Sequence, residues 1–247
     1  MFVPDVSTYQ KTVAWRTVRA AGVTAAICRA TYGVAGIDAQ LVPNRAGMRS
    51  AGIATRGAYH FGYLTEDPVK QAKQFARVWG ALWPGEFAVL DVESLSGSLG
   101  TQAANRAWIA AFLGTVTPLV APGHPEAVLV YAGPGWWDAE VGAWAPAGHK
   151  LWVAEYNGLA EPVLPAGWAR ADVALWQFTD AAVVPGIPGR CDDSRLLLEP
   201  GAFTRPAPPK PAPKPTPVPA PHPVPAPAPL TKAEAVAKIT AIVEELQ

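Results

Sequence analysis

The chain has 247 residues, of which 50% are hydrophobic and 16% are charged. Such a length is enough for one large domain with a sizeable core or for two small domains. Twenty basic and twenty acidic residues give a formal net charge of zero. This excludes the overall positive charge that is typical of proteins that bind nucleic acid or anionic membranes. Two cysteines and four histidines supply neither a disulfide framework nor a structural zinc pattern. Cys28 and Cys191 could pair only if the fold brings them together, and we interpret them as free, buried thiols.

The first half of the chain alternates between short apolar strands and amphipathic helices. Strands are predicted at residues 2–7, 23–30, 53–61 and 87–93, and helices at 12–21, 38–50, 68–83 and 101–116. This alternation predicts βα units and a parallel sheet. Four more strands are predicted at 127–131, 150–156, 172–178 and 190–195, where the intervening segments carry no long helix. Eight strands with full helices only in the first half indicate an α/β fold, an irregular TIM-like barrel, with a doubly wound open sheet as the alternative.

The composition changes sharply at Arg205. Of the 24 residues at 206–229, 13 are proline, which predicts an extended linker on the order of 75 Å long if straight. The last segment opens with a capping box at Thr231 to Glu234 and predicts an amphipathic helix. Isolated helices of this length are only marginally stable. The segment is therefore either a tail helix of low stability or a segment for self-association or for targeting to the cell wall. The predicted domains are a barrel at 1–204, a linker at 205–229 and a tail helix at 230–247.

The most informative stretch is a short apolar run that ends in two carboxylates, Phe87-Ala-Val-Leu-Asp-Val-Glu93. Because side chains alternate along a strand, Asp91 and Glu93 project to the same side. Two neighbouring acids cannot both ionise cheaply, so we expect the pKa of one to rise while the pKa of the other stays low. Glycoside hydrolysis uses such a pair, with one protonated acid for the leaving oxygen and one anion. Two solvated acids at a strand end are the simpler alternative.

Other acids and aromatic side chains recur where the predicted strands end. The acids are Asp5, Asp91, Glu93 and Asp192, and the aromatic residues are Tyr59, Phe61, Tyr131, Trp152, Tyr156 and Trp176. Strand ends meet at one mouth of a barrel, where rings can stack on sugars while acids handle protons and hydroxyls. Each residue also has a structural explanation as a cap, a turn residue or a core side chain. His60 is the only histidine among these motifs, so we predict no metal site and no cofactor.

Eight short motifs follow one another between residues 2 and 200. They are Asp5-Val-Ser-Thr-Tyr-Gln10, Ala26-Ile-Cys-Arg-Ala-Thr31 with Asp38 following, Ala51-Gly-Ile53, Gly57-Ala-Tyr-His-Phe61, Leu90-Asp-Val-Glu93, Leu151-Trp-Val-Ala-Glu-Tyr156, Leu175-Trp-Gln-Phe178 and Gly189-Arg-Cys-Asp192. In this order they resemble the motifs of family 25 glycoside hydrolases. These are the Chalaropsis-type N-acetylmuramidases, which are common as phage endolysins and bacterial autolysins.

The resemblance implies a fold and a reaction. The fold is an irregular β/α barrel with five βα units and three further strands. The reaction is hydrolysis of the β-1,4 bond between N-acetylmuramic acid and N-acetylglucosamine in peptidoglycan. Glu93 takes the position of the proton donor, and Asp91 would orient or stabilise the substrate's acetamido group, which serves as nucleophile in a substrate-assisted scheme. The remaining matches are the cleft acids Asp5 and Asp192 and the groove tyrosines Tyr59 and Tyr156.

The chain departs from the family pattern at two positions. Asp193 follows Asp192 where the family more often has an apolar residue, and strand alternation allows only one of the two to face the cleft. Glu155 stands where the family often has glutamine, and it either adds negative charge near the site or points away. Two other functions remain open: a non-catalytic glycan-binding barrel, and a hydrolase of another N-acetylated glycan such as chitin.

The expected partner is the peptidoglycan glycan strand, and neither nucleic acid nor membrane insertion is expected. The first residues, Met1-Phe-Val-Pro-Asp5, lack the basic and apolar regions of a signal peptide. No apolar run approaches the roughly 20 residues that span a bilayer. We therefore expect synthesis in the cytoplasm and action at the bacterial cell wall after release, as in phage-type lysis.

Overall fold

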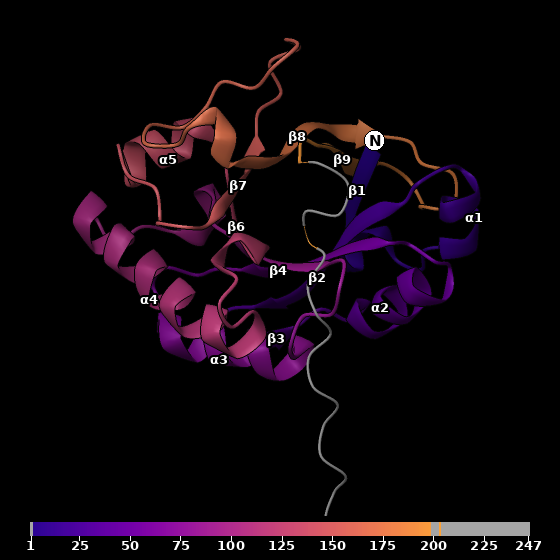
Figure 1. Ribbon diagram of the computed structural model, residues 1–247, viewed down its shortest axis with the longest axis horizontal. Helices are drawn as coiled ribbons and strands as arrows, with labels where there is room; N and C mark the ends of the chain where they lie inside the picture. The colour runs from indigo at the N-terminus through magenta and orange to yellow at the C-terminus, as the bar shows by residue number, and fades with distance from the viewer. Residues whose placement is uncertain (1, 199–202, 204–247) are drawn as a thin grey trace, which may run out of the picture. The chain divides into compact units, whose positions relative to one another are not determined.

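The computed structural model describes residues 2–198 and 203 (Figure 1). Five strands are each followed by a helix: β1 (Phe2–Val6) by α1 (Trp15–Ala20), β2 (Ala25–Tyr32) by α2 (Leu41–Ser50), β4 (Thr55–Phe61) by α3 (Pro68–Trp79), β5 (Glu86–Asp91) by α4 (Gln102–Val120), and β6 (Val128–Ala132) by α5 (Pro134–Glu140). Then come β7 (Lys150–Ala154), β8 (Val173–Ala182) and β9 (Cys191–Leu196), while β3 (Gly36–Ile37) is a two-residue strand beside β2. The five βα units and three further strands that the resemblance implies are confirmed.

Eight of the strands close into a barrel. Their order is β1-β9-β8-β7-β6-β5-β4-β2, and β1 also pairs with β2, which completes the ring. Neighbouring strands are parallel except at β9, which runs antiparallel to both β1 and β8. The closing pair, in which Asp5 lies opposite Ile27, rules out the open doubly wound sheet. The carboxyl ends of the parallel strands therefore meet at one mouth.

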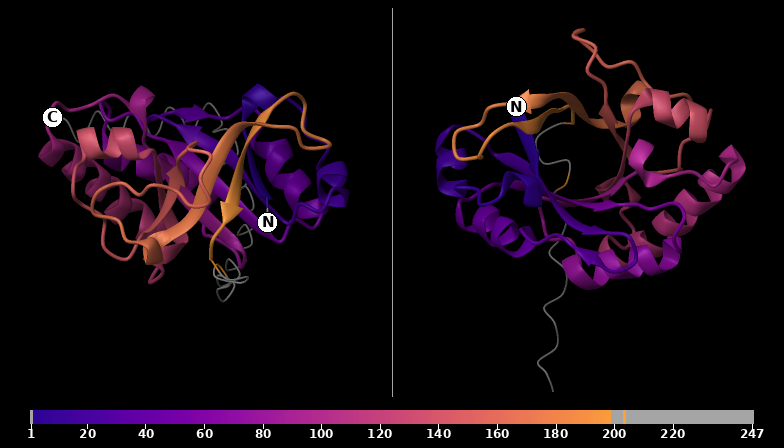
Figure 2. Two further views of the ribbon diagram at one scale, coloured as in Figure 1. Left: turned by 90° about the horizontal axis from the view of Figure 1, so that it is seen from above. Right: turned by 180° about the vertical axis from the view of Figure 1, so that it is seen from behind.

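The helices surround only part of this barrel. Figure 1 shows α1 to α5 in an arc around the strands, whereas the orange side formed by β8 and β9 has no helix over it, and Figure 2 shows the same arrangement from above and from behind. Asp67 caps α3 by accepting a hydrogen bond from the Lys70 N–H at 2.9 Å, and Pro68 follows it in the first turn. Helix α5 was not predictable from periodicity, because its seven residues include Pro134 and Gly135 and show no apolar repeat.

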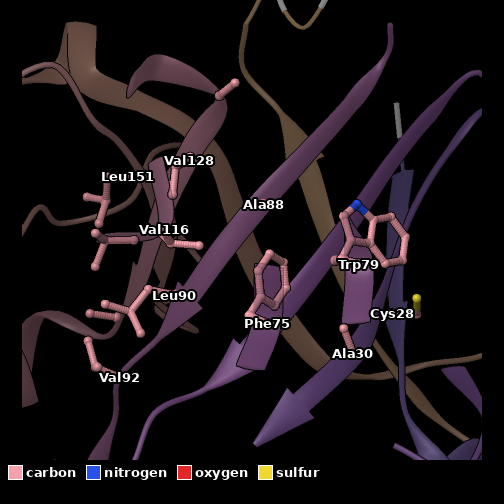
Figure 3. Packing of buried hydrophobic residues seen from close by; sticks show 14 of the residues in the cluster. Cys28, Ala30, Phe75, Trp79, Ala88, Leu90, Val92, Val116, Val128 and Leu151 are labelled. Atoms are coloured by element: carbon pink, nitrogen blue, oxygen red, sulfur yellow. The ribbon is translucent and has the colours of Figure 1, made fainter. Parts of the chain in front are cut away.

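Alternate side chains of each strand serve two separate apolar layers. The outer layer lies between strands and helices, and Figure 3 shows Phe75 and Trp79 of α3 beside residues such as Ala30 and Ala88 on the strands. The inner layer fills the barrel, where the Phe87 ring stacks on Phe203 with centroids 4.5 Å apart. Phe87 lies near the start of β5, and Asp91 is the last residue of the same strand. The apolar rings therefore lie toward one end of the barrel interior and Asp91 lies at the other end, which is the mouth.

Both cysteines are free and buried, as predicted. Burial raises the pKa of each thiol, to about 12 for Cys191, so both behave as core residues. The predicted linker at 205–229 and tail helix at 230–247 lie outside the described residues. Among the helices of residues 2–198, none has the length and apolar character needed to cross a membrane.

Candidate active site

A cavity of about 730 Å³ opens at the mouth of the barrel, and the four predicted acids line it. Asp5 is near the end of β1 and Asp91 ends β5. Glu93 follows two residues later, where the chain turns into a short 3-10 helix at Ser94–Ser96. Asp192 lies on β9 directly opposite Asp5 in the antiparallel ladder. Three strands that are distant in sequence thus bring four carboxyl groups into one cavity.

Five of the six predicted aromatic residues surround these acids. Tyr59, Phe61, Tyr131 and Trp152 line the same cavity. Tyr156 lines an adjoining groove of about 270 Å³, and Glu93 and Tyr131 are shared by the cavity and the groove. The other groove residues include Trp136 and Glu155.

Trp176 is the sixth, and it lies outside the cavity. Its side chain belongs to the outer apolar layer, where its Nε1–H donates to the Glu155 carbonyl at 2.7 Å and the Arg195 guanidinium covers its ring at 5.0 Å. Strand alternation is the physical reason: Leu175 faces the barrel interior, so its neighbour faces outward. The expectation that Trp176 lines the cleft is corrected on this point.

The structure also answers which of the two neighbouring aspartates on β9 faces the cavity. Asp192 lines it, whereas Asp193 does not. Asp193 accepts a hydrogen bond from the Ser194 N–H at 2.9 Å. Ser194 is again on the inner face, where its hydroxyl accepts from Trp152 Nε1–H at 3.0 Å. The alternation along β9 therefore assigns the inner face to Asp192.

Asp91 is the acid with an unused oxygen. It is 7% exposed, and its Oδ1 has no hydrogen-bond partner among the described residues. Phe61 and Tyr131 lie opposite it on the two neighbouring strands. A buried carboxylate oxygen without a donor is costly, so the ionised form of Asp91 lacks a stabilising partner on this side, while the residue itself lines the cavity.

Burial shifts the whole acid cluster in one direction. It raises the pKa of Asp91 well above its ordinary value, and the charge of Glu93 adds to the rise. Burial also raises the pKa of Glu93, with a further contribution from Asp192. The expectation that one pKa of this pair stays low is therefore wrong. The reason is that both carboxyls are removed from water and that two further acids, Asp5 and Asp192, face them.

Gln177 is a buried residue of the site that the sequence analysis did not name. Its Oε1 accepts hydrogen bonds from the Tyr131 and Tyr156 hydroxyls at 2.8 and 2.5 Å. Its Nε2 donates to Asp5 Oδ2 at 2.9 Å. The signal was present in the alternation of β8, because an inward Leu175 places Gln177 on the inner face as well.

Arg29 is the second such residue, and it is the only basic side chain among the described residues that line the cavity. Its Nε lies 2.8 Å from Asp38 Oδ2 in an ion pair. Its guanidinium carbon lies 5.3 Å from the ring centres of both Tyr9 and Tyr32. Asp38 also accepts the Thr8 N–H at 3.0 Å, which ties the loop that carries Tyr9 to β2. Arg29 and Asp38 both belong to the motif that begins at Ala26, but the sequence does not show that they form an ion pair beside Tyr9.

His60 has a structural role. Its ring nitrogens lie 2.8 Å from Thr31 Oγ1 and 2.9 Å from Gln71 Oε1. Burial lowers its pKa to about 4, so the ring is neutral at neutral pH and joins β4 to β2 and α3. Within residues 2–198 and 203, no group of three or more His, Cys, Asp or Glu side chains is arranged to hold a metal ion.

Comparison with known proteins identifies relatives of the chain. Residues 4–187 match the family model described as "Glycosyl hydrolases family 25". Lysozyme M1 of Streptomyces globisporus is 30% identical over 206 residues, covering 78% of this chain and 66% of that protein. The N,O-diacetylmuramidase of Chalaropsis sp is 27% identical over 210 residues, covering 78% and 96%. The crystal structure of the bacterial lysozyme from Streptomyces coelicolor is 27% identical, with a TM-score of 0.74, covering 82% of this chain and 94% of that chain.

Proposed function

The chain belongs to glycosyl hydrolases family 25 and is therefore a glycoside hydrolase, and we propose that it is an N-acetylmuramidase. The proposed reaction is cleavage of the β-1,4 bond between N-acetylmuramic acid and N-acetylglucosamine in peptidoglycan. The names of the two curated relatives, a lysozyme and a diacetylmuramidase, support this choice of substrate. The role of a phage endolysin is a finer proposal, and it rests on the sequence resemblance alone.

In this proposal Glu93 is the general acid and base. Its raised pKa, caused by burial and by the charge of Asp192, favours the protonated form that a leaving oxygen requires. Glu93 lines both the cavity and the adjoining groove, so a glycan chain that runs through both passes this side chain. A scissile oxygen can thus reach the proton donor while sugars on either side are bound.

The observation that carries the proposal is the carboxyl group of Asp91, which lines the cavity together with Glu93 and whose Oδ1 has no hydrogen-bond partner among the described residues. The acetamido N–H of an N-acetylated sugar bound in the cavity is a donor that would pair with this carboxylate. A hydrogen bond to the ionised carboxylate also offsets the cost of its burial, so the substrate itself would favour the charged form of Asp91. The acetamido oxygen is then oriented for attack on the anomeric carbon, and Asp91 stabilises the positive charge that develops.

The aromatic walls favour a carbohydrate polymer as the substrate. Tyr59, Tyr131 and Trp152 line the cavity, while Trp136 and Tyr156 line the groove beyond Glu93. Flat rings of this kind pack against the apolar faces of sugars. A non-catalytic binding barrel would have the same walls, but it would have no use for four acids with raised pKa values in one cavity.

Analysis of the fragments released from purified peptidoglycan of defined composition tests this proposal. We expect products whose reducing end is N-acetylmuramic acid, identified by mass spectrometry. Products that end in N-acetylglucosamine would instead assign a different glycosidic bond. Absence of any new reducing end, with cleavage by a known muramidase in a parallel digest, would support the non-catalytic barrel. A digest of chitin oligosaccharides under the same conditions separates the chitinase alternative.

A further inference from the structure

Arg29 brings one positive charge into an otherwise acidic cavity. Among the described residues that line the cavity and the adjoining groove, it is the one with a basic side chain. Its strand explains why it faces the cavity: Ile27 lies in the inner apolar layer and Cys28 in the outer one, so Arg29 is again on the inner face. A negatively charged group on a bound molecule would be repelled by the four acids and attracted by Arg29.

The guanidinium group of Arg29 is held in place before any ligand binds. Its Nε donates to Asp38 Oδ2 at 2.8 Å, and Asp38, which is 3% exposed, also accepts the Thr8 N–H at 3.0 Å. The rings of Tyr9 and Tyr32 flank the guanidinium, each with its centre 5.3 Å from the central carbon. A group that is already fixed loses less conformational entropy when it binds a ligand.

The terminal nitrogens of this guanidinium remain available. The contact with Asp38 is the one hydrogen bond that the Arg29 side chain makes with the described residues, so Nη1 and Nη2 donate to no acceptor among them. The side chain is 14% exposed, and neither nitrogen is buried without a partner, so both are accessible to solvent. A planar guanidinium with free N–H groups matches the two oxygens of a carboxylate.

Arg29 also lies within reach of a sugar that Asp91 holds. On β4, which lies between β2 and β5, Tyr59 is opposite Arg29 and Phe61 is opposite Asp91. Neighbouring strands are about 4.8 Å apart, which places the two backbones on the order of 10 Å from each other. In an N-acetylated sugar the acetamido group is on C2, and a substituent on the adjacent C3 oxygen can extend toward a second protein group at this separation.

The substituent at this position distinguishes the two sugars of peptidoglycan. N-acetylmuramic acid differs from N-acetylglucosamine by a lactyl ether at O3, whose carboxyl group is free in the bare glycan and joined to peptide in the cell wall. We propose that Arg29 determines specificity for muramic acid by donating from Nη1 and Nη2 to the carboxyl or carbonyl oxygens of the lactyl group. The inference rests on the proposed function, because it names the part of the substrate that a muramidase must recognise.

Ligand binding to the full-length E93Q variant, in which cleavage is expected to be slow, tests this role. One ligand is the tetrasaccharide of alternating N-acetylglucosamine and N-acetylmuramic acid with free lactyl carboxyl groups, and the other is chitotetraose, which has no lactyl group. By isothermal titration calorimetry we expect E93Q to bind the muramyl ligand about 10–100-fold more tightly, the usual effect of a hydrogen bond between charged groups. With Arg29→Met added, this preference should be lost while the affinity for chitotetraose is retained. Equal weakening of both ligands would show that Arg29 only organises the cavity and would overturn the proposal, as would an unchanged preference.

Two further substitutions in the E93Q background serve as controls. Arg195→Met removes an arginine that covers the ring of Trp176 outside the cavity, so we expect the full preference to remain. A loss as large as that of R29M would trace the preference to net charge and contradict the proposal. Arg29→Lys keeps a positive charge beside the buried Asp38, which guards against misfolding, but it lacks the planar guanidinium. We expect a reduced preference, and the full preference in R29K would overturn the assigned contact.

Because no bond is cleaved in these measurements, the inference and the proposed function can fail separately. Fragments that end in N-acetylmuramic acid, together with a preference that does not depend on Arg29, would retain the muramidase and overturn the inference. Fragments that end in N-acetylglucosamine, together with a preference that does depend on Arg29, would retain the inference and overturn the proposed bond.

A third ligand tests the inference for the substrate as it occurs in the cell wall. It is the same muramyl tetrasaccharide with L-alanine joined to each lactyl group through an amide, whose carbonyl oxygen still accepts hydrogen bonds. We expect R29M to weaken its binding as well. An equal affinity of E93Q and E93Q/R29M for this ligand would overturn the role of Arg29 in recognising peptidoglycan.

Discussion

The environment of individual carboxyl groups determines what this cavity can do. Asp91 and Glu93 are two residues apart, yet only Asp91 has a fully buried oxygen without a partner, whereas Glu93 borders both the cavity and the groove. The deeper acid is therefore suited to hold a substrate group, and the more open acid to exchange a proton with substrate and water. Arg29 moderates the cluster, because its positive charge opposes the rise in the pKa of Asp91.

The direction of these shifts predicts the pH dependence of hydrolysis. Glu93 must hold a proton to act as an acid, and its pKa is raised, so activity is lost as the pH rises through that raised value. Asp91 must ionise against the substrate, and its pKa is raised as well, so activity is also lost on the acidic side. We expect a bell-shaped profile of kcat/KM with both limbs above the value of about 4 typical of free carboxyls. A flat profile between about pH 4 and 8, the interval between ordinary carboxyls and neutral solution, would contradict the pairing.

The sequence predicted the acids of the site better than it predicted their surroundings. Asp91 and Glu93 were recognisable because a local rule, alternation after a buried strand, places them together. Gln177 obeys the same rule but was overlooked, since a lone amide carries no charge pattern. Arg29 and Asp38 belong to one motif of the resemblance, but their contacts with each other and with Tyr9 depend on how separate loops meet. The pKa shifts likewise depend on burial by the whole barrel.

At the scale of the element, β9 matters most, because it is the antiparallel strand that joins β1 to β8. Its register places Asp192 against Asp5, and its alternation separates Asp192 from Asp193. The sequence left the choice between these aspartates open, since either phase of a short strand is compatible with the pattern. The amphipathic α3 and the 19-residue α4 were easier to predict than the seven-residue α5.

This alternation gives a pair of matched substitutions. Asp192→Asn removes a charge that raises the pKa of Glu93, so we expect hydrolysis at neutral pH to fall and the basic limb to move to lower pH. Asp193→Asn changes an outward-facing side chain whose oxygen can still accept the Ser194 N–H, so we expect near-wild-type kinetics. Rates and pH profiles of the two variants on purified cell walls provide the measurement. Equal effects of both changes would mean that the assignment of the inner face to Asp192 is wrong.

At the scale of the whole molecule, the residues that stabilise the barrel and the acids of the site lie in different parts of its interior. Apolar rings occupy its interior toward the amino ends of the strands, and acids occupy its mouth. Phe203 lies beyond the last strand, is 4% exposed and stacks on Phe87. The Gly85 N–H donates to its carbonyl at 3.0 Å. The helix-free side of β8 and β9 was predictable from the loss of helical periodicity, but the return of Phe203 to the barrel was not.

Substitution of Phe203 tests this separation. We expect Phe203→Ala to lower the free energy of unfolding by about 3–5 kcal/mol, the usual cost of removing a buried phenyl ring. The exposed Phe2, at 60% accessibility, is the control, and Phe2→Ala should change stability by only about 0.5 kcal/mol. Denaturant unfolding of both variants gives the comparison. Similar losses from the two substitutions would show that Phe203 does not pack in the barrel in solution.

The most direct test of the proposed chemistry is the rate at which Glu93→Gln releases new reducing ends from purified peptidoglycan. The amide keeps the size of the side chain but cannot deliver the proton, so we expect the rate to fall by about 10²–10⁴-fold. Circular dichroism and Tm should match those of the wild type, since Glu93 is only half-buried and its side chain is not part of the apolar core. Hydrolysis by E93Q at the rate of the wild type would contradict the assignment of Glu93 as the proton donor.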